Sequence, residues 1–131
     1  MGNPSIQTVL STDPPPENAV LGSPAHGAEV HFRGIVRGTE NARAIAGLNY
    51  SAYLPMAEKI LREVAWAAAR EHPEARVLIH HMIGFVAAGE TSVLVAVALP
   101  HSTAAFELCH HLLRRVKTEV PIWKEAVLAA D

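Results

Sequence analysis

One run of eight residues places the tightest limit on the fold. From Ser92 to Leu99 the sequence reads Ser-Val-Leu-Val-Ala-Val-Ala-Leu, with almost no polar side chain. A strand without a polar face must be covered on both sides, so it belongs in the centre of a sheet. The run is also far shorter than the ~20 apolar residues that a membrane-spanning helix requires. We therefore expect a layered domain built around this strand, with no membrane segment.

Hydrophobic periodicity predicts the other strands. Apolar residues alternate with polar ones from Ala28 to Val36, and the alternation breaks at Gly34, which indicates a bulge. We expect a long hairpin between this strand and the one over residues 44–53, joined by a polar loop at residues 38–43. The remaining strands are expected at residues 5–11, 75–85 and 122–128.

Two segments have the spacing of amphipathic helices. The first begins at Leu54-Pro55, ends near His72-Pro73, and has a predicted core face of Met56, Ile60, Val64 and Ala67 or Ala68. The second is capped by Ser102 or Thr103 and ends before Pro121. Its predicted apolar stripe is Ala105, Phe106, Cys109, Leu112, Leu113 and Val116.

The order of these elements predicts an α+β fold, with two helices packed on a mainly antiparallel sheet. Residues 1–131 fit a single domain, because a chain of this length can bury one substantial core. Residues 1–27 would form a strand followed by an irregular, proline-rich lead-in, with one helical turn near residues 17–21.

Charge and cysteine content exclude several classes of protein. The formal net charge of −2 argues against a broad surface for nucleic acid or anionic membranes, so any anion site must be local. Cys109 is the only cysteine, which rules out an internal disulfide and favours a small core residue. We expect a cytoplasmic protein.

The candidate chemistry centres on two lysines. The chain has three lysines, and two of them, Lys117 and Lys124, stand on either side of a proline turn in a mostly apolar stretch. They could form an anion or acyl site with one acting as base or nucleophile, or they could be ordinary surface lysines. Arg37 at a strand end and His101 at a helix start are candidate anion ligands, with the same alternative open for each.

Paired histidines do not predict a metal site. His80 and His81 are adjacent on a strand and point to opposite faces, while His110 and His111 diverge by ~100° on a helix. The sequence also has no HExxH motif and no pair of cysteines. We expect no metal.

Six short motifs occur in register between residues 28 and 125. They are Phe32-Arg33-Gly34-Ile35-Val36-Arg37, Tyr50-Ser51-Ala52-Tyr53-Leu54-Pro55-Met56-Ala57, His80-His81-Met82-Ile83-Gly84, Gly89-Glu90, the segment His101 to Phe106, and the segment Lys117 to Lys124. Each motif is weak alone. Together they resemble the large, catalytic subunit of molybdopterin synthase.

This resemblance implies a fold of the α/β-hammerhead type and a sulfurtransferase activity in molybdenum cofactor biosynthesis. Family members convert cyclic pyranopterin monophosphate, a pterin phosphate, to molybdopterin. The sulfur arrives as the C-terminal thiocarboxylate of a small ubiquitin-like sulfur-carrier subunit. The resemblance also implies a homodimer within a heterotetramer, and no cofactor.

The resemblance assigns roles to individual residues. Lys117 would act as general acid/base or transient nucleophile, and Lys124 would hold the substrate or the carrier's tail. The remaining implied substrate-binding residues, which grip the phosphate or line its pocket, are Ile35, Val36, Arg37, His101 and Ser102.

The chain departs from the family pattern at Ser51, His81 and Ser102, and it ends at Asp131 without the usual longer C-terminal segment. Ser102 stands where an arginine is usual, and losing that contact would cost about 1.5–3 kcal/mol of substrate binding. A compensating arginine could be Arg33, Arg43 or one from a neighbouring subunit. The alternatives are a catalytically impaired relative that acts as a dimeric partner-binding module, or a small α+β domain whose lysines have no role.

Overall fold

The protein is an α+β structure with two sheets and two helices. In the computed structural model, which describes residues 2–130, the elements follow in the order β1 (Ser5–Ser11), β2 (Ala28–Ile35), β3 (Thr39–Glu40), β4 (Arg43–Ala52), α1 (Leu54–Ala69), β5 (Arg76–Met82), β6 (Gly84–Ala87), β7 (Thr91–Leu99), α2 (Ser102–Glu119) and β8 (Ile122–Leu128).

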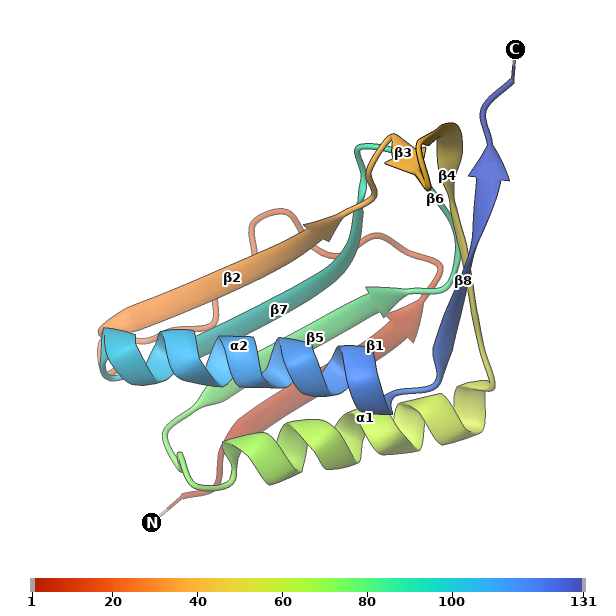
Figure 1. The fold of residues 1–131 in the computed structure, drawn as a ribbon. Coiled ribbons are helices and arrows are strands. Elements are labelled where there is room, and N and C mark those ends of the chain that lie inside the picture. Colours follow the sequence, from red (N-terminus) through yellow and green to blue (C-terminus); the bar gives the residue numbers. More distant parts are fainter. Residues whose placement is uncertain (1, 131) are drawn as a thin grey trace.

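The larger sheet has the strand order β1-β5-β7-β2, and both helices lie on one of its faces (Figure 1). Its pairs are antiparallel except β1 with β5, which run parallel. Helix α2 packs over β7 and β2, and α1 packs over β1 and beside α2. The core between the helices and this sheet includes Leu61, Ile79, Val95 and Leu112, all almost completely buried.

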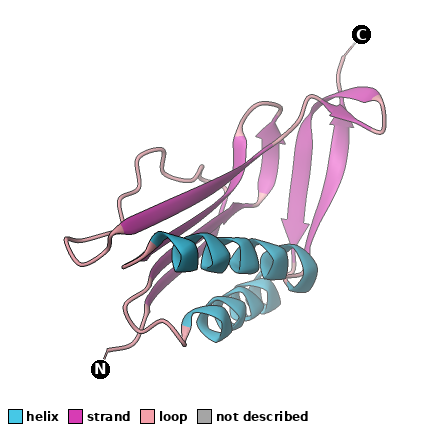
Figure 2. Cartoon of the chain, turned by 60° about the vertical axis from the view of Figure 1, so that its left-hand side comes forward, coloured by secondary structure: helices cyan, strands magenta, loops and turns pink. Residues whose placement is uncertain are grey.

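The smaller sheet is organised around β4, which pairs antiparallel with β3, β6 and β8. It stands next to the C-terminal end of α2, where β8 begins (Figures 1 and 2). A second, smaller core forms here from Val36, Ile45, Leu48, Met82 and Val86. The two sheets therefore meet where β2 and β5 end.

The predicted α+β class is confirmed, and so is the central position of β7, which lies between β5 and β2 and is buried along nearly its whole length. The strands divide between two sheets, however, where the sequence predicted one. The predicted hairpin between β2 and β4 is wrong, because β2 pairs with β7 along its length. Periodicity defines the apolar face of a strand but not its partner.

The polar loop predicted at residues 38–43 contains a short hairpin. Thr39 and Glu40 pair with Ala44 and Arg43, and the two turn residues have positive φ angles of 51° and 62°. The predicted bulge in β2 is confirmed, because the register with β7 shifts between Gly34 and Ile35.

Both helices are found where they were predicted, and their predicted core faces are confirmed except at one large residue in each helix. In α1, Met56 is 51% exposed, and the core face is Ala57, Leu61, Val64, Ala65 and Ala69. In α2, Phe106 is 65% exposed and Leu108 is buried in its place. The N-cap of α2 is His101, without a side-chain hydrogen bond, so the predicted cap by Ser102 or Thr103 is also wrong.

Residues 12–27, which we call the N-terminal strap, cross the sheet face opposite the helices. Ala19 and Leu21 pack against Leu78, Leu94 and Ala96 from β5 and β7. Residues 17 and 18 form only a turn, so the helical turn predicted at residues 17–21 is wrong. The strap supplies the second cover that the apolar β7 requires.

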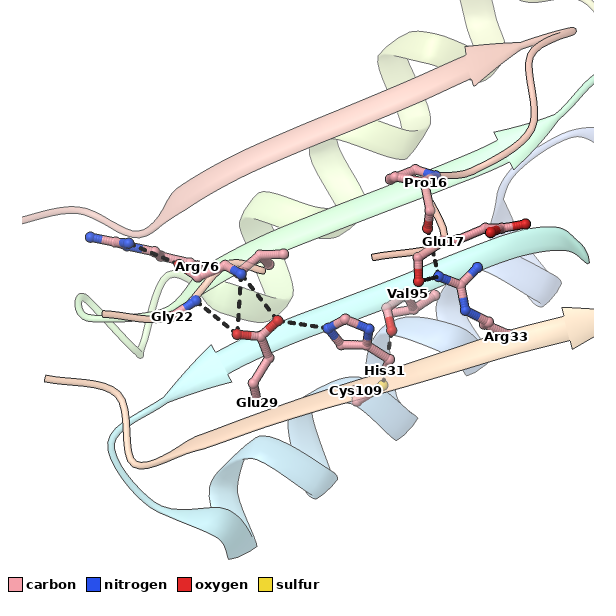
Figure 3. Close-up of polar contacts among 10 residues, drawn as sticks. Pro16, Glu17, Gly22, Glu29, His31, Arg33, Arg76, Val95 and Cys109 are labelled. Atoms are coloured by element: carbon pink, nitrogen blue, oxygen red, sulfur yellow. Dashed lines mark hydrogen bonds and ion pairs between the residues drawn. The ribbon is translucent and has the colours of Figure 1, made fainter. Parts of the chain in front are cut away.

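Polar side chains of the sheet hold the strap through its backbone (Figure 3). Arg33 donates to the carbonyl oxygens of Pro16 and Glu17, and Arg76 donates to that of Leu21. The Glu29 carboxylate accepts from the backbone N–H groups of residues 21 and 22, at 2.8–3.1 Å. No helix among residues 2–130 is long and apolar enough to span a membrane.

The corrected face of α1 gives a stability prediction. Leu61→Ala removes a side chain that is 1% exposed, and we expect the free energy of unfolding to fall by about 2–5 kcal/mol. The matched control, Met56→Ala, changes an exposed residue of the same helix and should cost less than about 0.5 kcal/mol. Urea denaturation measures both values, and equal losses would contradict the observed face.

Glu29 gives a prediction about pH. Burial raises the pKa of this carboxyl, but hydrogen bonds from His31 and from the N–H groups of Leu21 and Gly22 outweigh it, so the pKa is lowered. A carboxyl whose pKa is lowered by folding stabilises the fold at pH values above its unfolded-state pKa. This stabilisation is lost as the pH falls through the folded-state pKa. Glu29→Gln should therefore cost about 1 kcal/mol at pH 7, and this difference should shrink below about pH 4.5.

Denaturation midpoints of both proteins between pH 3 and pH 7 measure this difference. A stability difference between the two proteins that stays constant from pH 7 to pH 3 would mean that the charge of Glu29 does not hold the strap.

Candidate functional site

The predicted lysines lie in one pocket at the junction of the two sheets. The pocket has a volume of about 740 Å³ and is lined by the end of β2 and the residues that follow it, by β3, β4, β5 and β7, by the C-terminal part of α2, and by β8. Lys117 comes from the last turn of α2 and Lys124 from β8. Ile35, Val36 and Arg37 form part of the same lining.

The turn after α2 brings the two lysines together. The helix ends at Glu119, and Val120 leaves the helical conformation with φ −82° and ψ 126°, which is the conformation expected before a proline. The chain then reverses into β8, where Lys124 stands opposite Tyr50 of β4. Two residues seven positions apart thus face one pocket from a helix and a strand.

The pocket is strongly cationic within an acidic chain. Arg33, Arg37, Lys117 and Lys124 line it, with Glu40 as the carboxylate, so four positive charges against one negative charge leave +3. Because the whole chain carries −2, this concentration of positive charge is local. It favours an anionic ligand.

One wall of the pocket is formed by an aromatic pair. The rings of Tyr50 and His81 meet edge to face, with centroids 5.1 Å apart and planes at 79°. His81 is 9% exposed, and burial lowers its pKa, so the imidazole is neutral at pH 7. The expectation that His80 and His81 point to opposite faces agrees with the contacts, because His80 bonds instead to the strap carbonyl of Asp13.

The structure places five of the seven predicted site residues in this pocket, but not His101 and Ser102. These two lie exposed at the start of α2, 15 residues or more before Lys117. A helix rises roughly 1.5 Å per residue, so they stand roughly 22 Å from Lys117 along the same helix. Within one chain they cannot contact a ligand held by the lysines.

Two arginines of the chain are candidates to replace the one missing at Ser102. Arg33 lines the pocket, and its Nη2 atom donates to the carbonyl oxygens of Pro16 and Glu17. Arg43 is exposed and is not part of the lining. The third departure, Ser51, lies opposite Trp123 in the pairing of β4 with β8 and is likewise outside the lining.

Several lining residues received no role from the sequence. Tyr50 and His81 stand within the recognised motifs, and their presence there was the available signal. Glu40 reaches the pocket through the short β3 hairpin, which no periodicity indicates. Phe32 and Ser92 also line it, the latter donating from its hydroxyl to the Gly34 carbonyl at 3.3 Å.

Cys109 lies away from the pocket, in the core between α2 and the larger sheet, as predicted. Its Sγ donates to the carbonyl oxygen of Val95 at 3.5 Å, and burial raises the pKa of the thiol. Such a thiol is a packing group. Residues 2–130 contain no cluster of three or more His, Cys, Asp or Glu side chains suited to a metal ion.

The fold and pocket define an α+β protein with a cationic pocket where two sheets meet the end of a helix. The chain belongs to the MoaE protein family, whose model matches residues 8–119. The predicted family is thereby confirmed.

Individual relatives agree with this assignment. A molybdopterin synthase catalytic subunit from Nostoc sp. is 37% identical over 109 residues, which cover 82% of this chain and 66% of the relative. The crystal structure of molybdopterin synthase from Staphylococcus aureus matches with a TM-score of 0.77 and 32% identity, covering 85% of this chain and 81% of that one. The chain spans about half the length or less of some other curated relatives.

A second similar structure comes from Helicobacter pylori and is described as a complex of subunits 1 and 2 of molybdopterin-converting factor. It matches with a TM-score of 0.66 and 25% identity, covering 82% of this chain and 74% of that one.

The cationic pocket gives a binding prediction. We expect Lys117→Met and Lys124→Met each to weaken sulfate binding about five- to tenfold, because each removes one charge from the pocket. Lys59→Met is the matched control, since Lys59 is exposed on α1 and pairs with Glu63 at 4.0 Å. Sulfate titrations at low ionic strength measure the three affinities, and an equal effect of all three changes would exclude a localised site.

Proposed function

We propose that the protein is the large, catalytic subunit of a molybdopterin synthase, a sulfurtransferase in molybdenum cofactor biosynthesis. Its reaction would move sulfur from a thiocarboxylated small subunit to cyclic pyranopterin monophosphate, forming molybdopterin. The observation that carries this proposal is the meeting of Lys117 and Lys124 in a pocket of net charge +3, in a member of the MoaE family.

The pocket suits a reaction between two anions. A thiocarboxylate and a phosphate repel each other in water, and the four cations offset that repulsion when both enter the site. Lys117, at the end of α2, would act as general acid/base or transient nucleophile, and Lys124 would hold the substrate or the incoming tail. Arg37 would bind the phosphate, with the backbone of Ile35 and Val36 beside it.

The proposed partner is a small ubiquitin-like sulfur-carrier subunit, whose C-terminal tail would enter the pocket. The Helicobacter pylori relative, described as a complex of two subunits, supports such an assembly. The smaller sheet also carries exposed apolar side chains, among them Phe85, Trp123 and Leu128. Exposed aromatic residues beside a pocket are typical of protein interfaces.

We propose that two copies of this chain form a homodimer and that each copy binds one small subunit, which makes a heterotetramer. The distance along α2 between His101 or Ser102 and Lys117 supports the homodimer. His101 and Ser102 stand roughly 22 Å from Lys117 in the same chain, so they would serve the substrate only at the pocket of a second copy. Arg33, already in the lining, would supply the guanidinium that Ser102 lacks.

We propose that the protein works in the cytoplasm. Its one described cysteine is a buried free thiol, as expected in a reducing compartment.

The test is reconstitution from purified components. Mixed with a thiocarboxylated small subunit and cyclic pyranopterin monophosphate, the wild-type protein should form molybdopterin. Lys117→Ala should lower the rate at least about 100-fold, because it removes the proposed acid/base group. Lys59→Ala, on the exposed face of α1, should leave the rate unchanged.

A second candidate is a dimeric partner-binding module with impaired catalysis, which the uncharged Ser102 favours. The two functions differ in a strain that lacks its own large subunit. Restored molybdopterin synthesis in that strain would rule out the impaired module, whereas binding of the small subunit without product would rule out the synthase.

A further inference from the structure

His81 is held at the pocket by its place on β5. Its neighbour His80 points to the other face of the sheet, where Nε2 lies 2.8 Å from the Asp13 carbonyl oxygen of the strap. His81 therefore faces the pocket and forms part of its lining. Alternation along a strand makes this placement a property of the backbone.

One hydrogen bond determines which nitrogen of His81 carries the proton. Nδ1 lies 2.7 Å from the Met82 carbonyl oxygen, which can only accept, so Nδ1 is the protonated donor. In a neutral ring the other nitrogen, Nε2, then has a free lone pair. Burial favours this neutral form by lowering the pKa of His81.

The Nε2 atom is open to the pocket. No residue among 2–130 forms a hydrogen bond with Nε2. Every side-chain nitrogen or oxygen in that range that is shielded from solvent does have a hydrogen-bond partner. Nε2 must therefore touch solvent, and for a side chain 9% exposed that solvent is the pocket. A buried imidazole thus presents an unused acceptor to whatever the pocket holds.

Neighbouring groups lock this acceptor in place and give it a distinct role. The edge-to-face contact with Tyr50 limits rotation of the ring, and Tyr50 stands opposite Lys124 in the strand pairing. The four cations of the pocket can donate hydrogen bonds but cannot accept them. Among the charged and imidazole side chains of the lining, only His81 and the Glu40 carboxylate can accept a hydrogen bond.

We infer that His81 is the hydrogen-bond acceptor that recognises a ring N–H group of the bound pterin, while the cations bind its phosphate. This inference rests on the proposed function and adds a specificity-determining residue to it. Pterin rings carry N–H donors, whereas a sulfate ion at neutral pH has no hydrogen to donate. A site with a largely buried acceptor selects for a ligand that donates to it, because a bound ligand without a donor would displace the pocket solvent from Nε2 and leave that atom without a partner.

The test compares two substitutions with two probes. His81→Phe keeps a ring against Tyr50 but removes the acceptor, and His81→Gln keeps an acceptor oxygen near the position of Nε2. We expect cyclic pyranopterin monophosphate to bind about tenfold more weakly to the Phe variant and within about threefold of wild type to the Gln variant. Sulfate, which binds only the cations, should bind all three proteins equally.

Nitrogen NMR of histidine-labelled wild-type protein provides a second measurement that needs no variant. We expect a Nδ1–H tautomer with a bare Nε2 in the free protein, and a shift of the Nε2 resonance when the pterin is added. This measurement decides the matter even if His81→Phe does not fold.

Four outcomes would overturn the inference: equal pterin affinity of wild type and the Phe variant, a Gln variant as weak as the Phe variant, equal loss of sulfate and pterin binding, or an Nε2 resonance that pterin does not move. Failure of the proposed function looks different. A wild-type protein that binds pterin through His81 but forms no molybdopterin would overturn the proposed function and support this inference. A protein that binds no pterin would overturn both.

Discussion

The structure depends on the need to cover both faces of β7. Helix α2 covers one face, with Leu112 and Val95 in the shared core. The other face is covered by a strap without regular structure, which offers only a few apolar side chains such as Ala19 and Leu21. Apolar burial alone is modest there, so hydrogen bonds from Glu29, Arg33 and Arg76 to the strap backbone complete the attachment. These bonds also satisfy backbone groups that no sheet pairs.

The pocket follows from the way in which the two sheets are joined. The larger sheet stops where β2 and β5 end, and β4 begins a second sheet around a separate core. Lys117 closes this junction from the helix side and Lys124 from β8. Like charges that line one pocket repel each other, so an anion bound there would stabilise the folded protein by offsetting that repulsion.

Sequence reasoning succeeded where the signal was local. The strand over Ser92–Leu99 and the positions of both helices could be predicted from composition, proline positions and periodicity. Most of the buried faces of α1 and α2 could be predicted as well, except at Met56 and Phe106, which are large apolar residues one position away from the true stripe. Strand partners are also long-range choices, which is why the hairpin of β2 and β4 was predicted wrongly.

The same distinction applies to the site. Lys117, Lys124 and Arg37 were predicted because they stand in recognisable motifs, and the structure places them together, although their roles remain a proposal. Glu40 enters through a two-residue strand that carries no periodic signal. The tautomer of His81 depends on one backbone carbonyl, that of Met82. Such details are set by backbone direction, which a residue pattern does not contain.

The attachment of Arg33 to the strap has a consequence for binding. Among residues 2–130, none forms a hydrogen bond or ion pair with the side chains of Lys117, Lys124 or Arg37, so each must give up rotational freedom to hold an anion. The Arg33 guanidinium is already immobilised by two strap carbonyls, and it has further N–H groups to offer. The strap therefore restricts one of the four cations of a pocket on whose lining none of its own residues lies.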